Sequence, residues 1–99
     1  MKNTFKNIIL NKNFFQNPHH PGEILLEEFL VPAKISQVEF AKKLKWTRAK
    51  LNELIKGKRG ITAETALDLA DALKTSAKIW MNMQAAYDLN KAMKLRKTA

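Results

Sequence analysis

The sequence contains no cysteine, and only three glycines and three prolines among its 99 residues. Without cysteine the chain has no disulfide framework, no cysteine-ligated zinc site and no thiol nucleophile, so its stability must come from packing. The longest uncharged apolar runs, such as Ile8–Leu10, are far too short to cross a bilayer, and no small-residue cleavage site follows the basic N-terminus. We therefore expect a soluble, cytoplasmic protein that does not enter a membrane.

Sequence signals for catalysis and metal binding are also missing. Neither of the common glycine-rich phosphate-binding loops occurs. His19 and His20 are adjacent, but no third Asp, His or Cys follows at the spacing of a metal site. Glu27 and Glu28 face different directions on a helix, and no nucleophile stands beside a base. We expect no enzyme activity, no catalytic residues, no metal and no cofactor.

Acidic residues are half as frequent as basic ones, nine against eighteen, which gives a net charge of +9. Residues 36–60 hold eight basic and two acidic side chains, so a quarter of the chain carries most of that charge. A basic region this concentrated is typical of a nucleic-acid-binding surface. The alternative is a basic face that only keeps the protein soluble, and charge by itself leaves both open.

The sequence divides into three parts. Residues 1–17 place apolar side chains between Lys and Asn without a helical period, and a helix-breaking Pro-His-His-Pro-Gly cluster follows. We expect an N-terminal appendage over residues 1–19, one small domain over 20–95 and a short tail over 96–99. The apolar residues of the appendage would pack on the domain, meet a partner or form a disordered leader, and the sequence leaves these three open.

After Gly22 the apolar residues keep a helical period, and no alternating or β-branched segment predicts a strand. We expect an all-α, compact domain of five helices. The first covers about Gly22–Leu30 and is stopped by Pro32, and the second opens with a Ser-x-x-Glu capping box and covers Ser36–Leu44. The others are a third from the N-cap Thr47 to Gly57, a fourth from about Thr62 with Leu69 and Leu73 on its apolar stripe, and a fifth over Ser76–Lys94.

The second and third of these helices make a helix-turn-helix pattern. They are short, a tight turn joins them, and the later one begins at a hydroxyl cap and carries basic and polar residues. Their apolar residues recur at the spacing that lets the two helices bury against each other: Phe40, Ala41, Leu44, Trp46, Leu51 and Leu54.

Over residues 37–56 this pattern resembles the Xre, or lambda-repressor-like, helix-turn-helix class, and Gly57–Thr62 resembles its loop between the third and fourth helices. His20-Pro21-Gly22-Glu23 resembles the opening helix of the HigA-type antitoxins, a branch of that class. Trp80-Met81-Asn82-Met83-Gln84 and Tyr87-Asp88-Leu89 resemble their fifth helix. The class usually has a glycine with positive φ at the turn where this chain has Lys45, a conformation that costs a side chain on the order of 1 kcal/mol.

The resemblance implies an antitoxin of a type II toxin-antitoxin module. Such a protein neutralises a HigB-type toxin, which cleaves mRNA on the ribosome, and represses its own operon as a dimer. The implied partners are double-stranded operator DNA, a cognate small basic toxin and a second copy of the chain. The alternative is a stand-alone repressor of the phage or restriction-controller type, without a toxin.

A helix-turn-helix places the N-terminal half of its second helix in the major groove. Base contacts are then expected from the residues that do not face inward: Thr47, Arg48, Ala49, Asn52 and Glu53. Of these, Arg48 has forked donors that match guanine O6 and N7, while Asn52 and Glu53 are equally compatible with a merely solvent-facing position. Phosphate contacts, which position the protein without reading sequence, are expected from Gln37, Lys50, Lys56, Lys58 and Arg59.

The aromatic and Met stripe of the fifth helix has two interpretations. Trp80, Met83 and Tyr87 lie at helical spacing and belong to the residue types that interfaces favour, so they are candidates for a dimer or partner contact. The same spacing is typical of core packing. Residues 1–17, which the family resemblance does not cover, are the other candidate for toxin contact.

Overall fold

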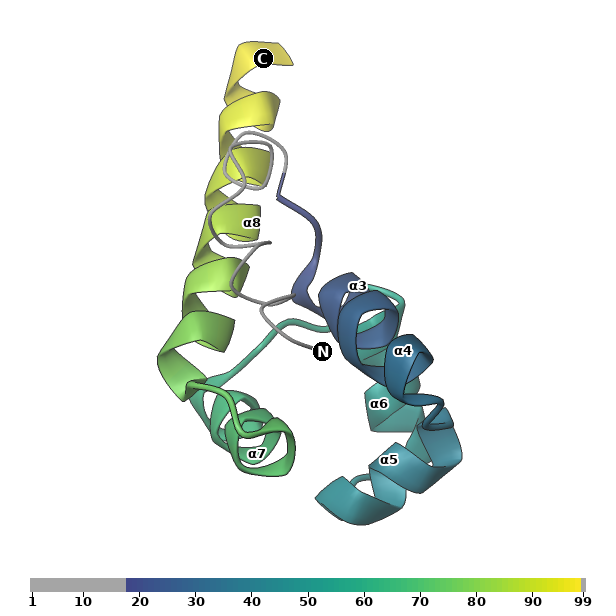
Figure 1. Ribbon diagram of the computed structural model, residues 1–99. Helices are drawn as coiled ribbons and strands as arrows, with labels where there is room; N and C mark the ends of the chain where they lie inside the picture. The colour runs from purple at the N-terminus through teal and green to yellow at the C-terminus, as the bar shows by residue number, and fades with distance from the viewer. Residues whose placement is uncertain (1–17, 99) are drawn as a thin grey trace.

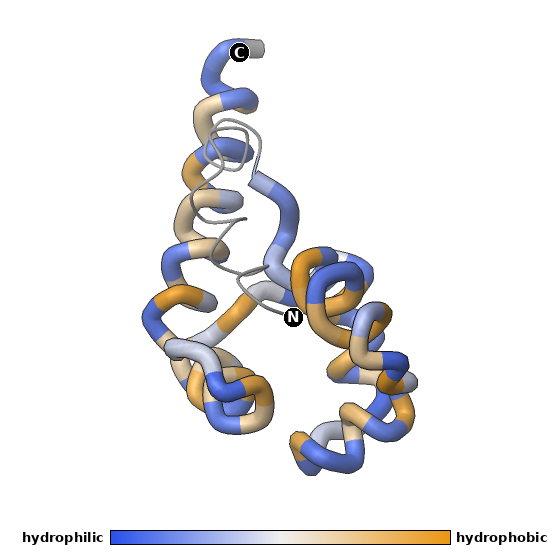
Figure 2. The backbone as a smooth tube through the Cα atoms, in the orientation of Figure 1, coloured by the Kyte–Doolittle hydropathy of each residue, from blue (hydrophilic) through white to orange (hydrophobic). Residues whose placement is uncertain are grey.

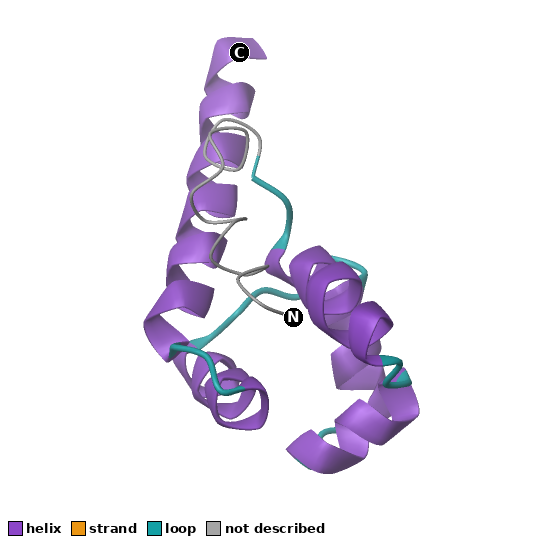
Figure 3. Ribbon diagram, viewed as in Figure 1, coloured by secondary structure: helices purple, strands orange, loops and turns teal. Residues whose placement is uncertain are grey.

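The computed structural model describes residues 18–98 of the chain, and all regular structure in that range is helical (Figure 3). A first helix is built from α3 (Pro21–Ile24), η1 (Leu25–Leu30) and α4 (Val31–Ala33). It is followed by α5 (Gln37–Leu44), α6 (Arg48–Ile55), α7 (Ala63–Leu73) and α8 (Ala77–Thr98). These five helices confirm the predicted all-α fold class. The expectations for residues 1–17 lie outside the described residues, and the proposed domain boundaries stay predictions.

The first helix continues past Pro32, where the sequence predicted a stop. Its middle, η1, is a π-helix, and the N–H of Val31 bonds to the carbonyl of Leu26, five residues back. Proline lacks an N–H and its ring excludes the carbonyl of the preceding turn, so a wider turn just before it lets the chain remain helical. The helix ends instead at Lys34, which has a left-handed φ of 57°.

The last helix is also longer than predicted. It was expected to end at Lys94, but α8 continues to Thr98 through most of the expected tail. Arg96 and Lys97 stand in its final turn, where positive charge interacts favourably with the negative end of the helix dipole. Composition therefore supports the extra turn, although no capping residue marks where it ends.

The core lies where the helices cross, and α3 and α6 approach each other closely at Gly22. A Cβ added to Gly22 would lie 1.8 Å from the carbonyl oxygen of Leu54, so only glycine fits at this crossing. The large side chains with less than 2% exposure include Trp80, Phe40, Leu25, Leu30, Leu51, Leu54, Leu69 and Met83. They come from the first helix, α5, α6, α7 and α8, so every helix contributes to one core.

Two pairs of helices determine the shape of the molecule. α5 packs on α6 and α7 packs on α8, while α3 contacts both α6 and α8. The C-terminal half of α8 extends away from the rest of the molecule (Figure 1). Hydrophobic and hydrophilic residues alternate along this projecting half (Figure 2), and Leu89, Met93 and Leu95 on it are 52% to 63% exposed. No helix in residues 18–98 combines the length and apolar content that a membrane span requires.

Candidate nucleic-acid interface

Local hydrogen bonds and backbone geometry define both ends of α5, including the turn that leads into α6. The Ser36 hydroxyl accepts from the Glu39 N–H, and the Glu39 carboxylate accepts from the Ser36 N–H, both over 3.1 Å, so the predicted capping box is present. Hydrogen bonds from the backbone N–H and the side chain of Ser36 to the Glu39 carboxyl lower its pKa. At the other end Lys45 has a φ of 61°, the positive value that the family resemblance implied. The N–H groups of Trp46 and Lys45 close the turn on the carbonyls of Ala41 and Lys42.

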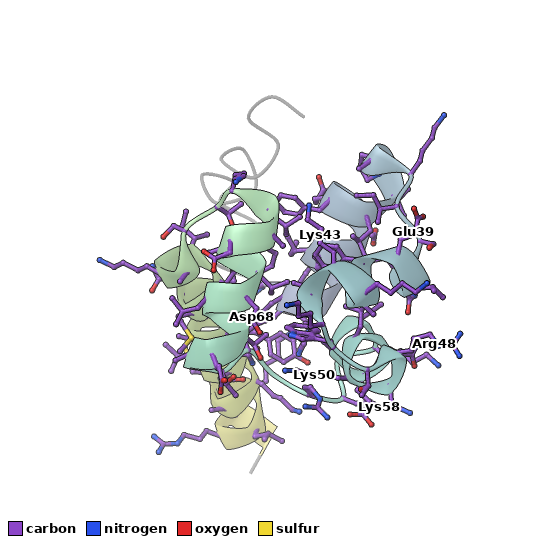
Figure 4. The ribbon with its side chains drawn as sticks, turned by 90° about the horizontal axis from the view of Figure 1, so that it is seen from below. Glu39, Lys43, Arg48, Lys50, Lys58 and Asp68 are labelled. Carbon is purple, nitrogen blue, oxygen red and sulfur yellow. The ribbon has the colours of Figure 1, made fainter. Side chains whose placement is uncertain are left out.

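The N-terminal turn of α6 presents its side chains to solvent. Thr47 caps the helix by accepting from the Lys50 N–H over 3.1 Å, as predicted. Arg48 and Ala49 are exposed, whereas Leu51 and Leu54 are buried. Figure 4 shows Arg48 on α6 and Lys58 on the following loop both extending away from the body of the molecule. The helix therefore has one buried face and one polar face, as its sequence indicated.

Asn52 and Gln37 link the two helices of the motif. The Nδ2 of Asn52 donates to the Oε1 of Gln37 over 3.4 Å, and both side chains are half-buried. Gln37 is the first residue of α5, where the N–H groups of the opening turn lie. The candidate base contact and the candidate phosphate contact are thus neighbours across the turn.

Lys50 belongs to a chain of contacts that reaches α7. Its Nζ lies 4.2 Å from the centroid of the Trp46 ring, within the range of a cation–π interaction. The indole Nε1 of Trp46 in turn donates to the Oδ2 of Asp68 on α7 over 2.9 Å. Sequence reasoning treated Trp46 only as an apolar residue and did not consider Asp68. These contacts hold the Lys50 ammonium beside the turn.

Glu53 and Arg59, assigned from sequence to bases and to phosphates respectively, are partners in the structure. The Nη2 and Nε of Arg59 donate to one carboxylate oxygen of Glu53 over 2.7 Å and 3.1 Å. Both side chains are 45% exposed, so the pair contributes less than about 1 kcal/mol to stability. Lys56 and Lys58 on the same loop are exposed.

The candidate partner residues on α8 are mostly internal. Trp80 is 0% and Met83 is 1% exposed, and the Trp80 indole donates to the Thr75 hydroxyl over 2.8 Å. Burial inside the chain leaves these two without surface for a second molecule, so it supports the core interpretation for both. Tyr87 is half-buried and its ring stands edge-on to His20, with centroids 4.9 Å apart.

His20 has a structural position that the sequence did not indicate. Its Nδ1 accepts from the Gly22 N–H over 2.9 Å, which caps α3. Burial lowers the pKa of the imidazole below its ordinary 6.5, and the carboxylates of Asp88 and Glu23 offset this only in part. The neutral ring keeps the lone pair that the cap needs. Within residues 18–98 no three His, Asp or Glu side chains gather where they could hold a metal ion.

The sequence pattern of the helix-turn-helix family matches residues 26–80, which is more than half of the chain. The chain belongs to the helix-turn-helix family. The chain is also similar to Virulence-associated protein I of Dichelobacter nodosus, with 48% identity over 74% of this chain and 68% of that protein.

Two solved structures place the chain within the helix-turn-helix family more closely. The Pseudomonas aeruginosa antitoxin HigA with higBA promoter has 39% identity and a TM-score of 0.78, over 83% of this chain and 89% of that one. An addiction module antidote protein of a HigA family from Coxiella burnetii has 40% identity and a TM-score of 0.77, over 83% and 89%. The resemblance to HigA-type antitoxins is confirmed, and the fold is that of the helix-turn-helix regulators.

Proposed function

We propose that this protein is an antitoxin that represses its own operon by placing the N-terminal half of α6 in the major groove of operator DNA. One observation carries the proposal: Arg48 and Ala49 are exposed on the first turn of a helix whose Leu51 and Leu54 are buried. A helix held in this way by its inner face offers its outer face to the groove.

The side chains on that outer face suit direct readout. The Arg48 guanidinium matches guanine O6 and N7, Ala49 suits a thymine methyl, and the Asn52 amide suits adenine. Thr47 and Glu53 complete the proposed base-facing set. Because Glu53 also accepts from Arg59, its contact with a base would release Arg59 toward the backbone.

Phosphate contacts are proposed for Gln37, Lys50, Lys56, Lys58 and Arg59. Gln37 stands at the N-terminus of α5, where the helix dipole favours a phosphate oxygen. Lys50 is held over Trp46, and the three loop residues are exposed beside α6. Such contacts set position and orientation on the duplex and make affinity dependent on salt.

The proposed protein partners are a cognate small basic toxin that cleaves mRNA and a second copy of the chain. Homology to HigA antitoxins supports the toxin. Dimerisation suits a two-fold operator, and with Trp80 and Met83 buried, the exposed apolar residues Leu89, Met93 and Leu95 of α8 are the proposed dimer surface. The Leu89→Lys variant should then be monomeric by analytical ultracentrifugation without loss of helix content.

The proposal is tested by a gel shift on the protein's own promoter and on unrelated DNA over a salt series. Specific repression predicts a promoter preference that persists while affinity falls steeply with salt. Equal binding to both DNAs would contradict it. Co-expression with the product of the adjacent reading frame tests the toxin: relief of growth arrest supports an antitoxin, and its absence favours a stand-alone repressor.

A further inference from the structure

The segment Lys56–Thr62 between α6 and α7, which we call the basic loop, carries three of the five proposed phosphate contacts. Its start is closed by Gly57, which has a φ of 76°, and by the Lys58 N–H, which donates to the Glu53 carbonyl over 2.8 Å. Its end is held by the side chain of Ile61, which is buried in the core. The charged residues Lys58 and Arg59 lie between these two points.

Gln84 of α8 reaches the basic loop from a helix that carries none of the proposed DNA contacts. Its Oε1 accepts a hydrogen bond from the Ile61 N–H over 2.8 Å. Its Nε2 donates to the Oδ1 of Asp88, one turn further along α8, over 2.9 Å. The bond to Asp88 fixes the orientation of the Gln84 amide, because only its NH2 group can donate to the carboxylate. The amide oxygen then faces the Ile61 N–H, whereas a reversed amide would place an NH2 group there.

Gly60 shows how closely Gln84 and the basic loop pack. A Cβ added at this glycine would lie 3.0–3.1 Å from the amide atoms of Gln84, which is tighter than an ordinary van der Waals contact. The loop backbone therefore rests directly on the Gln84 carboxamide. Trp80 and Met83, both buried, fix the part of α8 from which Gln84 projects.

His20 meets the opposite end of the basic loop. A Cβ added at Gly57 would lie 3.6 Å from the His20 ring, and that ring also packs edge-on against Tyr87 of α8. The loop is therefore supported at both ends by groups that rest on α8. The His20 imidazole also interacts with the backbone of Arg59 in this loop, whereas Gln84 bonds to the Ile61 N–H directly from α8 over 2.8 Å.

We propose that Gln84 is a positioning residue for DNA binding: it holds the basic loop in the conformation from which Lys58 and Arg59 reach the phosphates. This inference rests on the proposed function. Long cationic side chains lose rotamer freedom when they bind a phosphate. If the loop backbone is already fixed, binding loses less conformational entropy in total. Without Gln84 the Ile61 N–H loses its partner and the loop gains alternative conformations.

The test measures promoter affinity over a salt series, hydrogen exchange of the Ile61 amide, and the thermal midpoint. Gln84→Ala should weaken promoter binding by about three- to tenfold, the equivalent of one net hydrogen bond, and should speed Ile61 exchange. The matched control, Asn82→Ala, changes an exposed residue of the same helix and should leave affinity and exchange unchanged. Gly60→Ala perturbs the same contact from the loop side and should weaken binding in the same direction.

Two further variants separate positioning from general stability. The double variant Gln84→Glu with Asp88→Asn keeps an acceptor for the Ile61 N–H and exchanges the donor and acceptor along α8, so it should recover most of the affinity. In a background that carries Lys58→Ala and Arg59→Ala, adding Gln84→Ala should cost little further affinity, because the residues that it positions are gone.

The possible results distinguish this inference from the function on which it rests. If the wild-type protein shows no preference for its promoter, both are overturned. If the wild type prefers its promoter and Gln84→Ala binds equally well at each salt concentration, only the inference about Gln84 is overturned. An equal loss from Gln84→Ala with and without Lys58 and Arg59 would also overturn it, since the effect would then not pass through the loop.

Discussion

The two faces of α6 differ in burial and in polarity. The inner face places Leu51 and Leu54, both 0% exposed, in the core against the first helix and α5. The outer face carries exposed or half-buried polar side chains, among them Arg48 and Asn52. Within the eight residues of α6, the inner side chains therefore contribute to stability and the outer ones to the proposed recognition of DNA. Single substitutions should change one property without the other. The predictions below test this division, beginning with the largest expected effect.

Leu54→Ala should break the inner face. Removing a fully buried leucine side chain leaves a cavity, so the free energy of unfolding should fall by about 2–5 kcal/mol in urea titrations. Val31→Ala, at a position that is 62% exposed, is the control and should change it by less than about 0.5 kcal/mol. A small effect at Leu54 would mean that α6 is not held by its inner face.

Arg48→Ala should break the outer face. Loss of a forked contact to guanine should weaken operator binding by about 1–3 kcal/mol and relax specificity at one base pair. Because Arg48 is exposed, the free energy of unfolding should stay within about 0.5 kcal/mol of the wild type. Equal operator affinity of variant and wild type at fixed salt would refute this base contact.

Lys58→Ala should affect the same face in a different way. A lost phosphate contact weakens binding to all sequences alike and flattens the plot of log affinity against log salt by about 1. Lys42→Ala removes an equal charge from an exposed residue of α5 and should leave that slope nearly unchanged. A sequence-dependent loss at Lys58 would instead indicate a base contact.

Lys45→Gly concerns the turn that sets the angle between α5 and α6. Glycine adopts the observed φ of 61° without a Cβ penalty, so the free energy of unfolding should rise by about 0.5–1 kcal/mol. The same change at Lys42, inside α5, should instead lower it by about 1 kcal/mol. Chemical denaturation of both variants checks the difference in sign.

His20 should add a small pH dependence to stability. Its pKa is lowered in the folded state, mainly by burial, so the unfolded chain binds the proton more readily. The resulting stability is fully present above pH 6.5 and is lost as the pH falls below it. His20→Asn retains a capping side chain that does not titrate, so its stability should change less between pH 7 and pH 5. Parallel curves for the two proteins would contradict this role.

Much of the fold was predictable because its signals are local. Ser36, Thr47 and Thr62 cap the helices that the sequence assigned to them, since a cap depends only on the next three residues. The inward Leu51 and Leu54 followed from helical periodicity. The passage of the first helix through Pro32 was not predictable, because it depends on the π-helical turn before that residue.

The candidate site was predictable as a set of residues but not as a set of contacts. Sequence reasoning assigned Glu53 and Arg59 to different roles, whereas the folded chain pairs them over 2.7 Å. It also passed over Asp68 and treated Gln84 only as part of a family motif. The two bonds that these residues make, to Trp46 and to the Ile61 N–H, span 22 and 23 positions of the chain.

The amino-acid sequence by itself determined the order of the five helices, the caps at Ser36, Thr47 and Thr62, the inward face of α6 and the concentration of positive charge in residues 36–60. These features depend on neighbours within one or two turns, and such neighbours can be read in order along the chain. Only the tertiary structure decided which polar side chains meet, because that depends on where the helices cross. The crossing of α8 with the basic loop is the clearest case, since it brings Gln84 to Ile61.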